Sequence, residues 1–223
     1  MDGSLLQRKA NLVFEGQIPM SKLVYNVGIN DVKFGKRDNK VAYQTWQDML
    51  GRCFDKGLKN KNPTYLEVTC CKEWLRFSSF LVGFKGHYKE GGRLDKDLLI
   101  YNNKIYSPDT CIFVSPIVNS FCISKGRSKL PLGVIYNRYT YKNTSKGLSK
   151  PYRASIRKHG KPTKSLGQYE NINEAHRAWQ KAKISYGKEI ITTEADPKII
   201  KGIYRIIDKI QEDYNNNLET IYF

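Results

Sequence analysis

The sequence predicts an α+β fold with three parts: a strand–strand–helix unit, a small three-stranded sheet with a packed helix, and a C-terminal helix. Large apolar side chains recur at helical spacing over 41–54 and 72–82, as in helices that bury one face. Isoleucines follow the same spacing over 199–210. Three short runs between turns rich in Gly, Asn, Ser and Lys have the composition of strands: 132–136, 152–158 and 165–169. A length of 223 residues suits two small domains.

The charge of the chain is strongly basic and unevenly distributed. The formal net charge is +17. Residues 122–190 hold 16 lysines and arginines against three acidic residues, so less than a third of the chain carries +13. Each Lys or Arg that neutralises a phosphate releases condensed counterions, so this segment is expected to bind nucleic acid. Charge alone leaves two other classes open, a generally basic soluble protein and a ribosome-associated protein.

Cysteine usage and hydropathy indicate a compartment. The five cysteines form no Cys-x-x-Cys pair and include the vicinal Cys70 and Cys71, so we expect reduced thiols. No run of about 18 apolar residues is present, and the N-terminal segment lacks the pattern of a secretory signal. We therefore expect a soluble, cytoplasmic protein with no membrane partner.

The first third of the chain is expected to be mainly helical. Residues 1–40 are rich in Gly, Asn and Lys and give no clear fold signal, so we treat them as an N-terminal arm. A helix is expected over 41–54, with one apolar face: Tyr43, Trp46, Met49, Leu50 and Cys53. A short strand is expected over 65–69 and a second helix over 72–82.

The middle of the chain is expected to form a β-hairpin followed by a helix. Strands over 93–99 and 104–106 flank Tyr101–Asn103, and asparagine tolerates the positive φ that tight turns require. Another extended segment covers 111–114. Ser115–Pro116 is a good helix start, because proline is favoured at the first helical position.

Caps and apolar faces predict the last two helices. Asn171 or Asn173 is expected to cap a helix with a narrow apolar face: Ala175, Ala178, Trp179, Ala182 and Tyr186. Asp196 and Pro197 are expected at the N-cap and first position of the final helix. Its apolar face requires a partner, either within the chain or in a homodimer through this helix: Ile199, Ile200, Ile203, Ile206, Ile207 and Ile210.

Two segments of the chain resemble known families. The stretches YQTWQDMLGRC, VTCCKEWLRFSSFL and LDKDLLIYNNKIYSPDTCIFVSPIVN, which end at Asn119, resemble the phage HNH (His-Me finger) endonucleases. The stretches GVIYNRY, KPYRASIRKHGK and KSLGQYENINEAHRAW resemble the ethylene-response-factor-type DNA-binding domain, which often follows an HNH module in phage and mobile-element proteins. We therefore expect an N-terminal arm at 1–40, an HNH-like domain at 41–124, a DNA-binding domain at 125–190 and a C-terminal helix at 191–223.

The first resemblance implies a ββα-metal finger around one divalent cation. On the family's pattern, Asp95 matches the carboxylate ligand and Asn119 the second ligand. Lys96 stands where the family has its general-base histidine, and Thr110 where it has the asparagine that orients this base. Oxygen ligands completed by water and a phosphate oxygen suit Mg²⁺ or Mn²⁺ better than Zn²⁺. Such a cation would polarise the scissile phosphate.

Three residues are candidates for activating water. Lysine has an ordinary pKa of about 10.4, so Lys96 requires desolvation or a neighbouring cation to act as a base, or else its charge clamps the phosphate. Asp97 is expected on the strand face of Asp95, as a further ligand or a partner for Lys96. His87 lies on a Gly-flanked loop, either near the metal or simply in solvent. The Asp-Lys-Asp triplet also fits a surface hairpin with solvated charges.

The basic segment supplies the candidate contacts to double-stranded DNA. In an extended strand Arg153, Ser155 and Arg157 project from one face, and Ala154 and Ile156 from the other. Arginines on such a sheet reach guanine edges in the major groove, and lysines follow the phosphates. An ordinary solvated sheet surface has the same composition. The candidate contacts are Arg153, Arg157, Lys158, Lys161, Lys164, Arg138 and Lys129.

These interpretations give one main hypothesis and two alternatives. We expect a phage or mobile-element DNA endonuclease of the HNH class, which hydrolyses or nicks a phosphodiester in the host cytoplasm. The first alternative is a catalytically degenerate, HNH-derived DNA-binding protein that regulates or inhibits a host DNA process, and the lysine at position 96 favours it. The second alternative is an RNA-binding or ribosome-binding basic protein.

Overall fold

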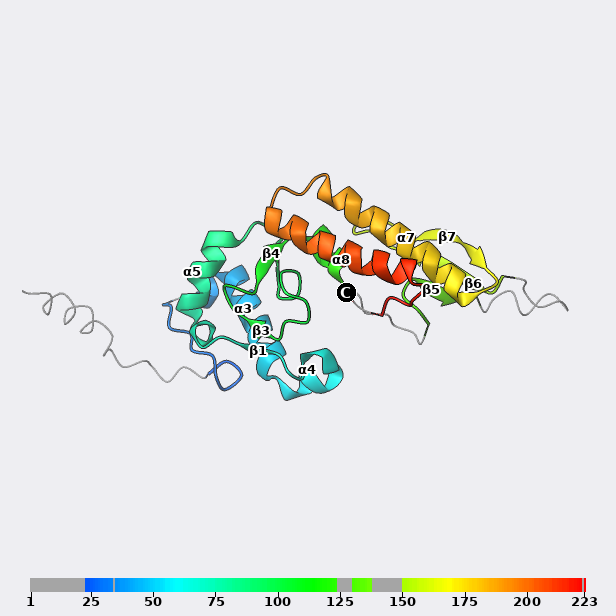
Figure 1. Ribbon diagram of the computed structural model, residues 1–223. Coiled ribbons are helices and arrows are strands. Elements are labelled where there is room, and N and C mark those ends of the chain that lie inside the picture. The colour runs from blue at the N-terminus through cyan, green and yellow to red at the C-terminus, as the bar shows by residue number, and fades with distance from the viewer. Residues whose placement is uncertain (1–22, 34, 124–129, 138–149, 222) are drawn as a thin grey trace, which may run out of the picture. The chain divides into compact units, whose positions relative to one another are not determined.

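The protein is an α+β chain (Figure 1) that divides into two compact units. Each unit buries apolar residues of its own. The computed structural model describes residues 23–33, 35–123, 130–137, 150–221 and 223. Unit 1 comprises the residues up to Gly86 together with Ile105–Ser107, and unit 2 comprises His87–Lys104 and Pro108–Phe223. This division differs from the expected one near 124–125, because most of the region 87–123 belongs with the C-terminal half.

Unit 1 consists of helices around a small parallel sheet. Its elements are α2 (Gly35–Asp38), α3 (Lys40–Phe54), α4 (Lys56–Lys61), the 3₁₀ helices η1 (Pro63–Tyr65) and η2 (Glu73–Leu75), α5 (Phe77–His87), β1 (Thr69–Cys70) and β3 (Ile105–Tyr106). The strands β1 and β3 pair in parallel, with Cys70 opposite Tyr106. The helix expected over 41–54 is confirmed, and its five expected apolar residues are all buried.

Aromatic rings fill the core of unit 1. The rings of Tyr43, Trp46 and Phe77 lie 5.2–5.6 Å apart, centroid to centroid. Burying the indole of Trp46 would leave its N–H without water, but this group donates to the carbonyl oxygen of Trp74 at 2.7 Å. A satisfied donor in an aromatic core fixes the ring's orientation as well as its depth.

Part of the expected N-terminal arm is an integral piece of unit 1. The backbone of Ile29 accepts from the amide of Phe77 and donates to the carbonyl of Leu75. Asp31 then caps the start of α5, since its carboxylate accepts from the amide and hydroxyl of Ser78 at 2.9 and 2.8 Å and pairs with Arg76 at 3.0 Å. The segment therefore supplies a cap that the composition of residues 1–40 did not reveal.

Unit 2 begins with a strand–strand–helix segment. The strands β2 (Arg93–Asp95) and β4 (Ile112–Val114) pair antiparallel, and α6 (Pro116–Cys122) follows directly. Ser115 caps α6 by accepting from the amide of Val118, and proline occupies the first helical turn, both as expected.

The hairpin expected between 93–99 and 104–106 is wrong. The strand β2 ends at Asp95, and β3 pairs with β1 instead. The side chain of Asp95 explains the early end, because one carboxylate oxygen accepts from the amides of Asp97 and Leu98 at 2.9 and 2.8 Å. Such a bond pattern turns the chain and competes with strand pairing.

A three-stranded antiparallel sheet with one packed helix follows, as expected. Its strands, in the order β5-β6-β7, are β5 (Val134–Tyr136), β6 (Tyr152–Ile156) and β7 (Lys164–Tyr169). The helix α7 (Ile172–Ile191) packs against the sheet. Asn171, rather than Asn173, is its N-cap, and the Asn171 side chain accepts from the amide of Asn173 at 2.7 Å.

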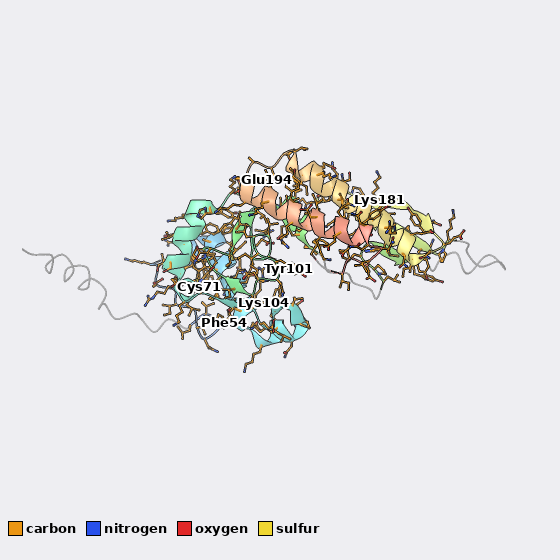
Figure 2. All side chains as sticks on the ribbon, viewed as in Figure 1. Phe54, Cys71, Tyr101, Lys104, Lys181 and Glu194 are labelled. Atoms are coloured by element: carbon orange, nitrogen blue, oxygen red, sulfur yellow. The ribbon has the colours of Figure 1, made fainter. Side chains whose placement is uncertain are left out.

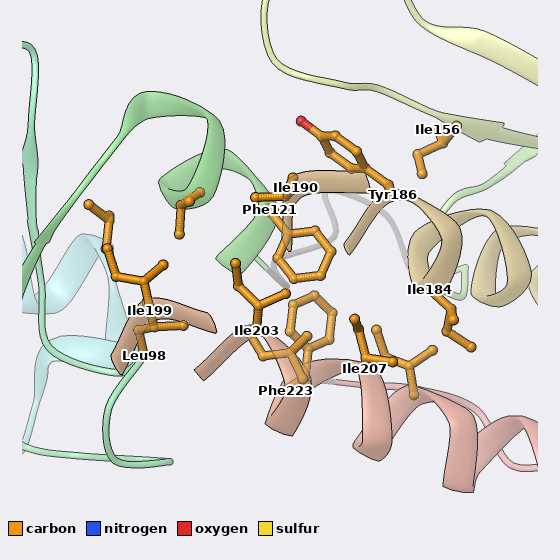
Figure 3. Packing of buried hydrophobic residues seen from close by; sticks show 14 of the residues in the cluster. Leu98, Phe121, Ile156, Ile184, Tyr186, Ile190, Ile199, Ile203, Ile207 and Phe223 are labelled. Atoms are coloured by element: carbon orange, nitrogen blue, oxygen red, sulfur yellow. The ribbon is translucent and has the colours of Figure 1, made fainter. Parts of the chain in front are cut away.

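The final helix, α8 (Pro197–Asn215), finds its partner within the chain. Asp196 caps it by accepting from the amide of Lys198 at 2.8 Å. Its apolar face packs on α7 in a cluster that includes Phe121 and Phe223, whose rings lie 6.5 Å apart (Figure 3). The buried members of this face are Ile199, Ile203, Ile206, Ile207 and Ile210. The contacts within unit 2 therefore account for the face that suggested a homodimer.

Two further features concern the cysteines and the apolar character of the helices. All five cysteines are free thiols. Across the described ranges, no helix has both the length and the apolar character needed to cross a membrane.

One glycine lets the sheet approach α7 closely. Gly133 has φ +77°, and a Cβ at this position would lie 1.9 Å from Cδ1 of Trp179. We expect Gly133→Ala to lower the free energy of unfolding by about 1–2 kcal/mol from the left-handed backbone and by about 1–3 kcal/mol more from overpacking. Urea unfolding followed by tryptophan fluorescence measures the change.

A second glycine provides the control for that prediction. Gly160 has φ +69°, and no described atom lies within 4 Å of its added Cβ. Gly160→Ala should therefore lower the free energy of unfolding only through the left-handed backbone conformation, without overpacking. Equal losses in the two variants would contradict the close approach of Gly133 to Trp179.

Candidate functional site

The turn after β2 brings the three residues of the Asp-Lys-Asp triplet together. Asp95 is largely withdrawn from solvent, and burial raises the pKa of its carboxyl, although the two amides that it accepts and the charge of Lys96 act in the opposite direction. A carboxyl group in this position is therefore harder to ionise than one in water. Its role in the fold is to end β2 and start the loop.

Lys96 is turned into the protein and closes that loop. The residue is only 8% exposed, and its ammonium donates to the carbonyl of Asn103 at 2.7 Å and pairs with the carboxylate of Asp97. In return, the side-chain amide of Asn103 donates to the carbonyl of Lys96 at 2.8 Å. These reciprocal bonds fix the loop 96–103. An ammonium engaged in this way offers no lone pair to a water molecule, so Lys96 does not act as a base here. Of the two roles expected for Asp97, the structure shows that of a partner for Lys96.

Arg205 holds the outer side of the same loop from α8. Its guanidinium donates to the backbone carbonyl of Asp97 at 2.9 Å and lies 5.5 Å from the ring centre of Tyr101, which is labelled in Figure 2. Nε of Arg205 is buried and has no hydrogen-bond partner among the described residues. The loop is thus pinned at two points, by Lys96 from within and by Arg205 from α8.

The remaining expected site residues are placed on separate elements. Asn119 is half-buried on α6, which packs against β2 and β4. Thr110 precedes β4, with its hydroxyl 3.9 Å from the sulfur of Cys111. His87 is exposed at the end of α5. In the part of the chain that the structure describes, no three His, Cys, Asp or Glu side chains are grouped closely enough to hold a metal ion.

The sequence interpretation missed the buried lysine of unit 2. Lys183 on α7 is 6% exposed, and its ammonium donates to the carbonyl of Phe121 at 2.6 Å and lies 4.5 Å from the ring centre of Phe121 and 5.0 Å from that of Phe223. Burial lowers its pKa from 10.5 to about 8, against the effect of the Cys122 thiol. The signal was available, because Lys183 follows Trp179 by four positions on the apolar face of this helix.

The outer face of the sheet presents three different side chains in one row. Ile135 on β5 lies opposite Arg153 on β6, which lies opposite Gln168 on β7. All three are exposed, and Ile135 keeps 42% of its surface in solvent. Their neighbour Ala154 is fully buried among the residues that pack under α7. The row thus combines an apolar, a cationic and an amide side chain on the face away from the helix.

The other expected DNA contacts fall into three groups. Arg157, Lys161 and Lys164 are exposed around the turn between β6 and β7. Lys158 is instead directed toward α7, where it pairs with Glu189 and lies over a tyrosine ring. Arg138 and Lys129 lie outside the described residues.

Ser155 does not share the exposed face of Arg153 and Arg157. It is 8% exposed, because a register shift between Ala154 and Ser155 interrupts the alternation of β6. A bulge of this kind places successive side chains out of the simple two-residue period. The two arginines remain exposed on either side of it.

Comparisons with known proteins do not add to this picture. No protein-family model, curated protein or solved structure matches the chain. The functional argument therefore depends on the chain's own residues and their geometry.

The buried lysine predicts a pH dependence of stability. Since the pKa of Lys183 falls to about 8 in the folded chain, the unfolded chain binds more protons between pH 8 and 10.5, and stability rises with pH across this window. Relative to Lys183→Met, the wild-type free energy of unfolding should increase by an amount on the order of 3 kcal/mol over that range. Urea titrations between pH 7.5 and 10.5 measure it.

Lys188→Met is the matched control for this series. Lys188 lies on the same helix and is exposed, so its removal should leave the pH slope of the wild type unchanged. Parallel pH profiles for the wild type and Lys183→Met would contradict the lowered pKa of Lys183 in the folded chain.

Proposed function

We propose that this chain is a double-stranded DNA-binding protein whose β5-β6-β7 sheet enters the major groove. The observation that carries the proposal is the exposed row of Ile135, Arg153 and Gln168 across the three strands. Each member suits a different base edge. Arginine donates in pairs to guanine, glutamine both donates to and accepts from adenine, and an apolar side chain contacts the thymine methyl group.

The cations beside this row supply the complementary backbone contacts. Arg157, Lys161 and Lys164 are exposed next to the sheet face, at positions suited to phosphates that flank a groove. Phosphate contacts fix register and orientation, while base contacts select sequence. The order of three strands and a helix, with the helix on the opposite face, also agrees with the resemblance to the ethylene-response-factor-type domain.

An RNA duplex is a poorer fit for the same surface. The major groove of A-form RNA is deep and narrow, so a three-stranded sheet does not enter it. The side chains of the row project from the middle of a sheet rather than from a loop that follows single strands. These arguments favour B-form DNA over the RNA-binding and ribosome-binding alternative.

Removing the two exposed arginines tests the sheet as a DNA surface. Arg153→Ala combined with Arg157→Ala should weaken binding to a duplex pool, because a base contact and a phosphate contact are lost. The slope of log K against log salt should fall by about 1, since the lost phosphate contact of Arg157 contributes about 0.9. Fluorescence anisotropy at several salt concentrations gives both quantities.

The control for this measurement carries the same loss of charge elsewhere in unit 2. Lys198 and Lys201 are exposed on α8, and changing both to alanine should alter affinity less. An unchanged salt slope in the double arginine variant would exclude the sheet face as the main contact.

A metal-dependent HNH nuclease is the second candidate function. The order β2-β4-α6, with Asp95 at the end of the first strand and Asn119 on the helix, favours it. The hydrogen bonds of Asp95 and Lys96 argue against it. One oxygen of Asp95 already accepts two amides, and Lys96 closes the loop. These residues do not fit a resident Mg²⁺ or Mn²⁺ by themselves, so we rank the nuclease-derived binding protein, a regulator or inhibitor of a host DNA process, above the enzyme.

Incubation with supercoiled plasmid separates the two candidates. We expect the wild-type protein to retard the plasmid without nicking it in Mg²⁺, in Mn²⁺ and in EDTA. We also expect no nicking by Lys96→His. Histidine cannot reproduce the bonds that the ammonium makes to Asp97 and Asn103, so the loop 96–103 would not hold the imidazole in a fixed position. Nicking that requires a divalent metal and disappears in Asp95→Ala would restore the endonuclease hypothesis.

A further inference from the structure

The segment that follows α8 folds back over α7 and α8. The amide of Leu218 donates to the carbonyl of Asp213 at 2.8 Å, and the carbonyl of Leu218 accepts from the side-chain amide of Gln180 at 3.0 Å. The ring of Phe223 is buried in the apolar cluster of unit 2. We call the described residues 216–221 and Phe223 the C-terminal strap.

Thr220 is at the centre of the polar contacts of the C-terminal strap and is fully buried. Its hydroxyl donates to the carboxylate of Asp213 at 3.0 Å and accepts from the side-chain amide of Gln180 at 3.0 Å. Its backbone amide donates to Nε2 of His176 at 3.0 Å. All three partners are buried side chains of α7 and α8. Because water does not replace bonds in such a place, the loss of one acceptor weakens the attachment of the C-terminal strap.

The partners of His176 determine its protonation state. The backbone amide of Thr220 can only donate, so Nε2, which faces it, must present a lone pair. The carbonyl oxygen of Leu132 can only accept, so Nδ1, which lies 2.9 Å from it, must carry the proton. The ring is 3% exposed and is stacked on Trp179, with 5.4 Å between the centroids. The neutral imidazole is therefore the form that satisfies both bonds.

The surroundings of the ring act on its charge in opposite directions. Burial has the largest effect and lowers the pKa of His176, because the imidazolium loses its contact with water. The carbonyl of Leu132 and the charges of Glu219 and Asp213 act in the other direction. The pKa of the buried ring remains below the ordinary value of 6.5.

Other charged side chains on the elements around the ring are engaged elsewhere. Lys209 on α8 is paired with Asp213, and Arg177 on α7 donates to a backbone carbonyl near the end of α8. Residues 130–137, which include Leu132, contain no charged side chain. A proton on Nε2 would therefore face the amide of Thr220, which offers it no acceptor.

We propose that His176 is a pH-sensitive latch, and that proton uptake at Nε2 releases the C-terminal strap from α7 and α8. The proton comes from solvent and occupies the lone pair that accepts from the amide of Thr220. The closed C-terminal strap holds His176 neutral, whereas the released ring has the ordinary pKa of about 6.5. The open state thus binds more protons below about pH 6.5, so closure is complete above this pH and weakens as the pH falls.

Opening of the C-terminal strap uncovers a charged part of the core. The ring of Phe223 lies 5.0 Å from the ammonium of Lys183 and 6.5 Å from the ring centre of Phe121, and Figure 3 shows these two rings side by side. Moving Phe223 away admits water to both groups. Acid would therefore expose a cation and an aromatic ring that are buried at neutral pH. The latch uses no residue of the proposed DNA surface.

Hydrogen exchange of the Thr220 amide tests the latch in the full wild-type chain. NMR gives the exchange rate at pH 7.5 and at pH 5.5, each divided by the intrinsic rate at that pH. We expect the protection of Thr220 to fall by up to about tenfold at the lower pH, because the released imidazole binds a proton there. The exchange should not respond to low concentrations of urea, whereas that of the buried Ile206 amide on α8 should accelerate, since local opening exposes little surface.

Two outcomes of this measurement overturn the latch. Protection of Thr220 that does not change between the two pH values would show that no proton is linked to its opening. Exchange of Thr220 that accelerates with urea as strongly as that of Ile206 would show that unit 2 opens as a whole.

Glutamine at position 176 separates the imidazole from the other titratable groups. The side-chain oxygen of His176→Gln accepts from the amide of Thr220 without titrating, so the pH dependence of protection should disappear. The other two histidines of the chain, His87 and His159, are exposed, and His87→Gln and His159→Gln should keep the wild-type dependence. A dependence that persists in His176→Gln would assign the proton to another group, such as Asp213, and would overturn the latch.

The imidazole itself supplies a readout that requires no variant. In ¹⁵N NMR spectra at pH 7.5 we expect His176 to be the Nδ1–H tautomer with an unprotonated Nε2, as its two partners require. Its titration should also occur at a lower pH than those of His87 and His159. An Nε2–H tautomer, or a titration at the same pH as the two exposed histidines, would contradict the proposal.

Discussion

Burial of the apolar face of α8 is the constraint on which unit 2 depends. Five isoleucines of this face lie in one cluster with residues of α7, and the strand–strand–helix segment contributes Leu98, Val114, Val118 and Phe121 to the same cluster. Full burial of such a side chain is worth roughly 1.5–3 kcal/mol. The segment that resembles a nuclease finger and the helix that covers the β5-β6-β7 sheet therefore share a core. Neither is an independent module joined by a linker.

That shared core determines what the charged residues between its parts can do. Arg205 extends from α8 to the loop 96–103 and donates to a backbone carbonyl there. Lys183 extends from α7 to α6 and donates to a backbone carbonyl of that helix. Lys96 does the same from inside the loop. A cation taken out of water requires such partners. The residues that a nuclease would use on water and metal are here part of the packing, which is why the geometry supports binding more strongly than cleavage.

Local signals in the sequence were sufficient for most helices and for the C-terminal sheet. Apolar spacing placed α3 and the faces of α7 and α8, and short polar caps placed Asn171 and Asp196, because these features depend on residues a few positions apart. The helix expected over 72–82 is instead the 3₁₀ helix η2 followed by α5, which begins at Phe77. The hairpin failed for the opposite reason. The partner of β3 is β1, from Thr69 and Cys70, and pairing between distant segments leaves no local pattern.

The candidate site was predictable only where the direction of a side chain follows from the regular repeat of its strand or helix. Arg153 is exposed as the alternation of a strand predicts, but one bulge was enough to bury Ser155. Asp97 was expected on the strand face of Asp95, but Asp95 itself ends the strand. Lys183 was counted with the surface charges although its helical position lies on the apolar face. In each case a tertiary contact or a backbone irregularity overrides the local rule.

The net charge of the chain therefore overstates the charge available to a polyanion. Lys96, Lys183 and Arg205 are engaged with backbone carbonyls, and Lys158 is paired with Glu189. Because DNA affinity depends on phosphates neutralised and counterions released, cations that keep their protein partners contribute little to it. The exposed cations of the sheet, such as Arg153 and Arg157, remain available instead. A basic composition favours nucleic acid in general, whereas the division between engaged and exposed cations shows which surfaces are available to it.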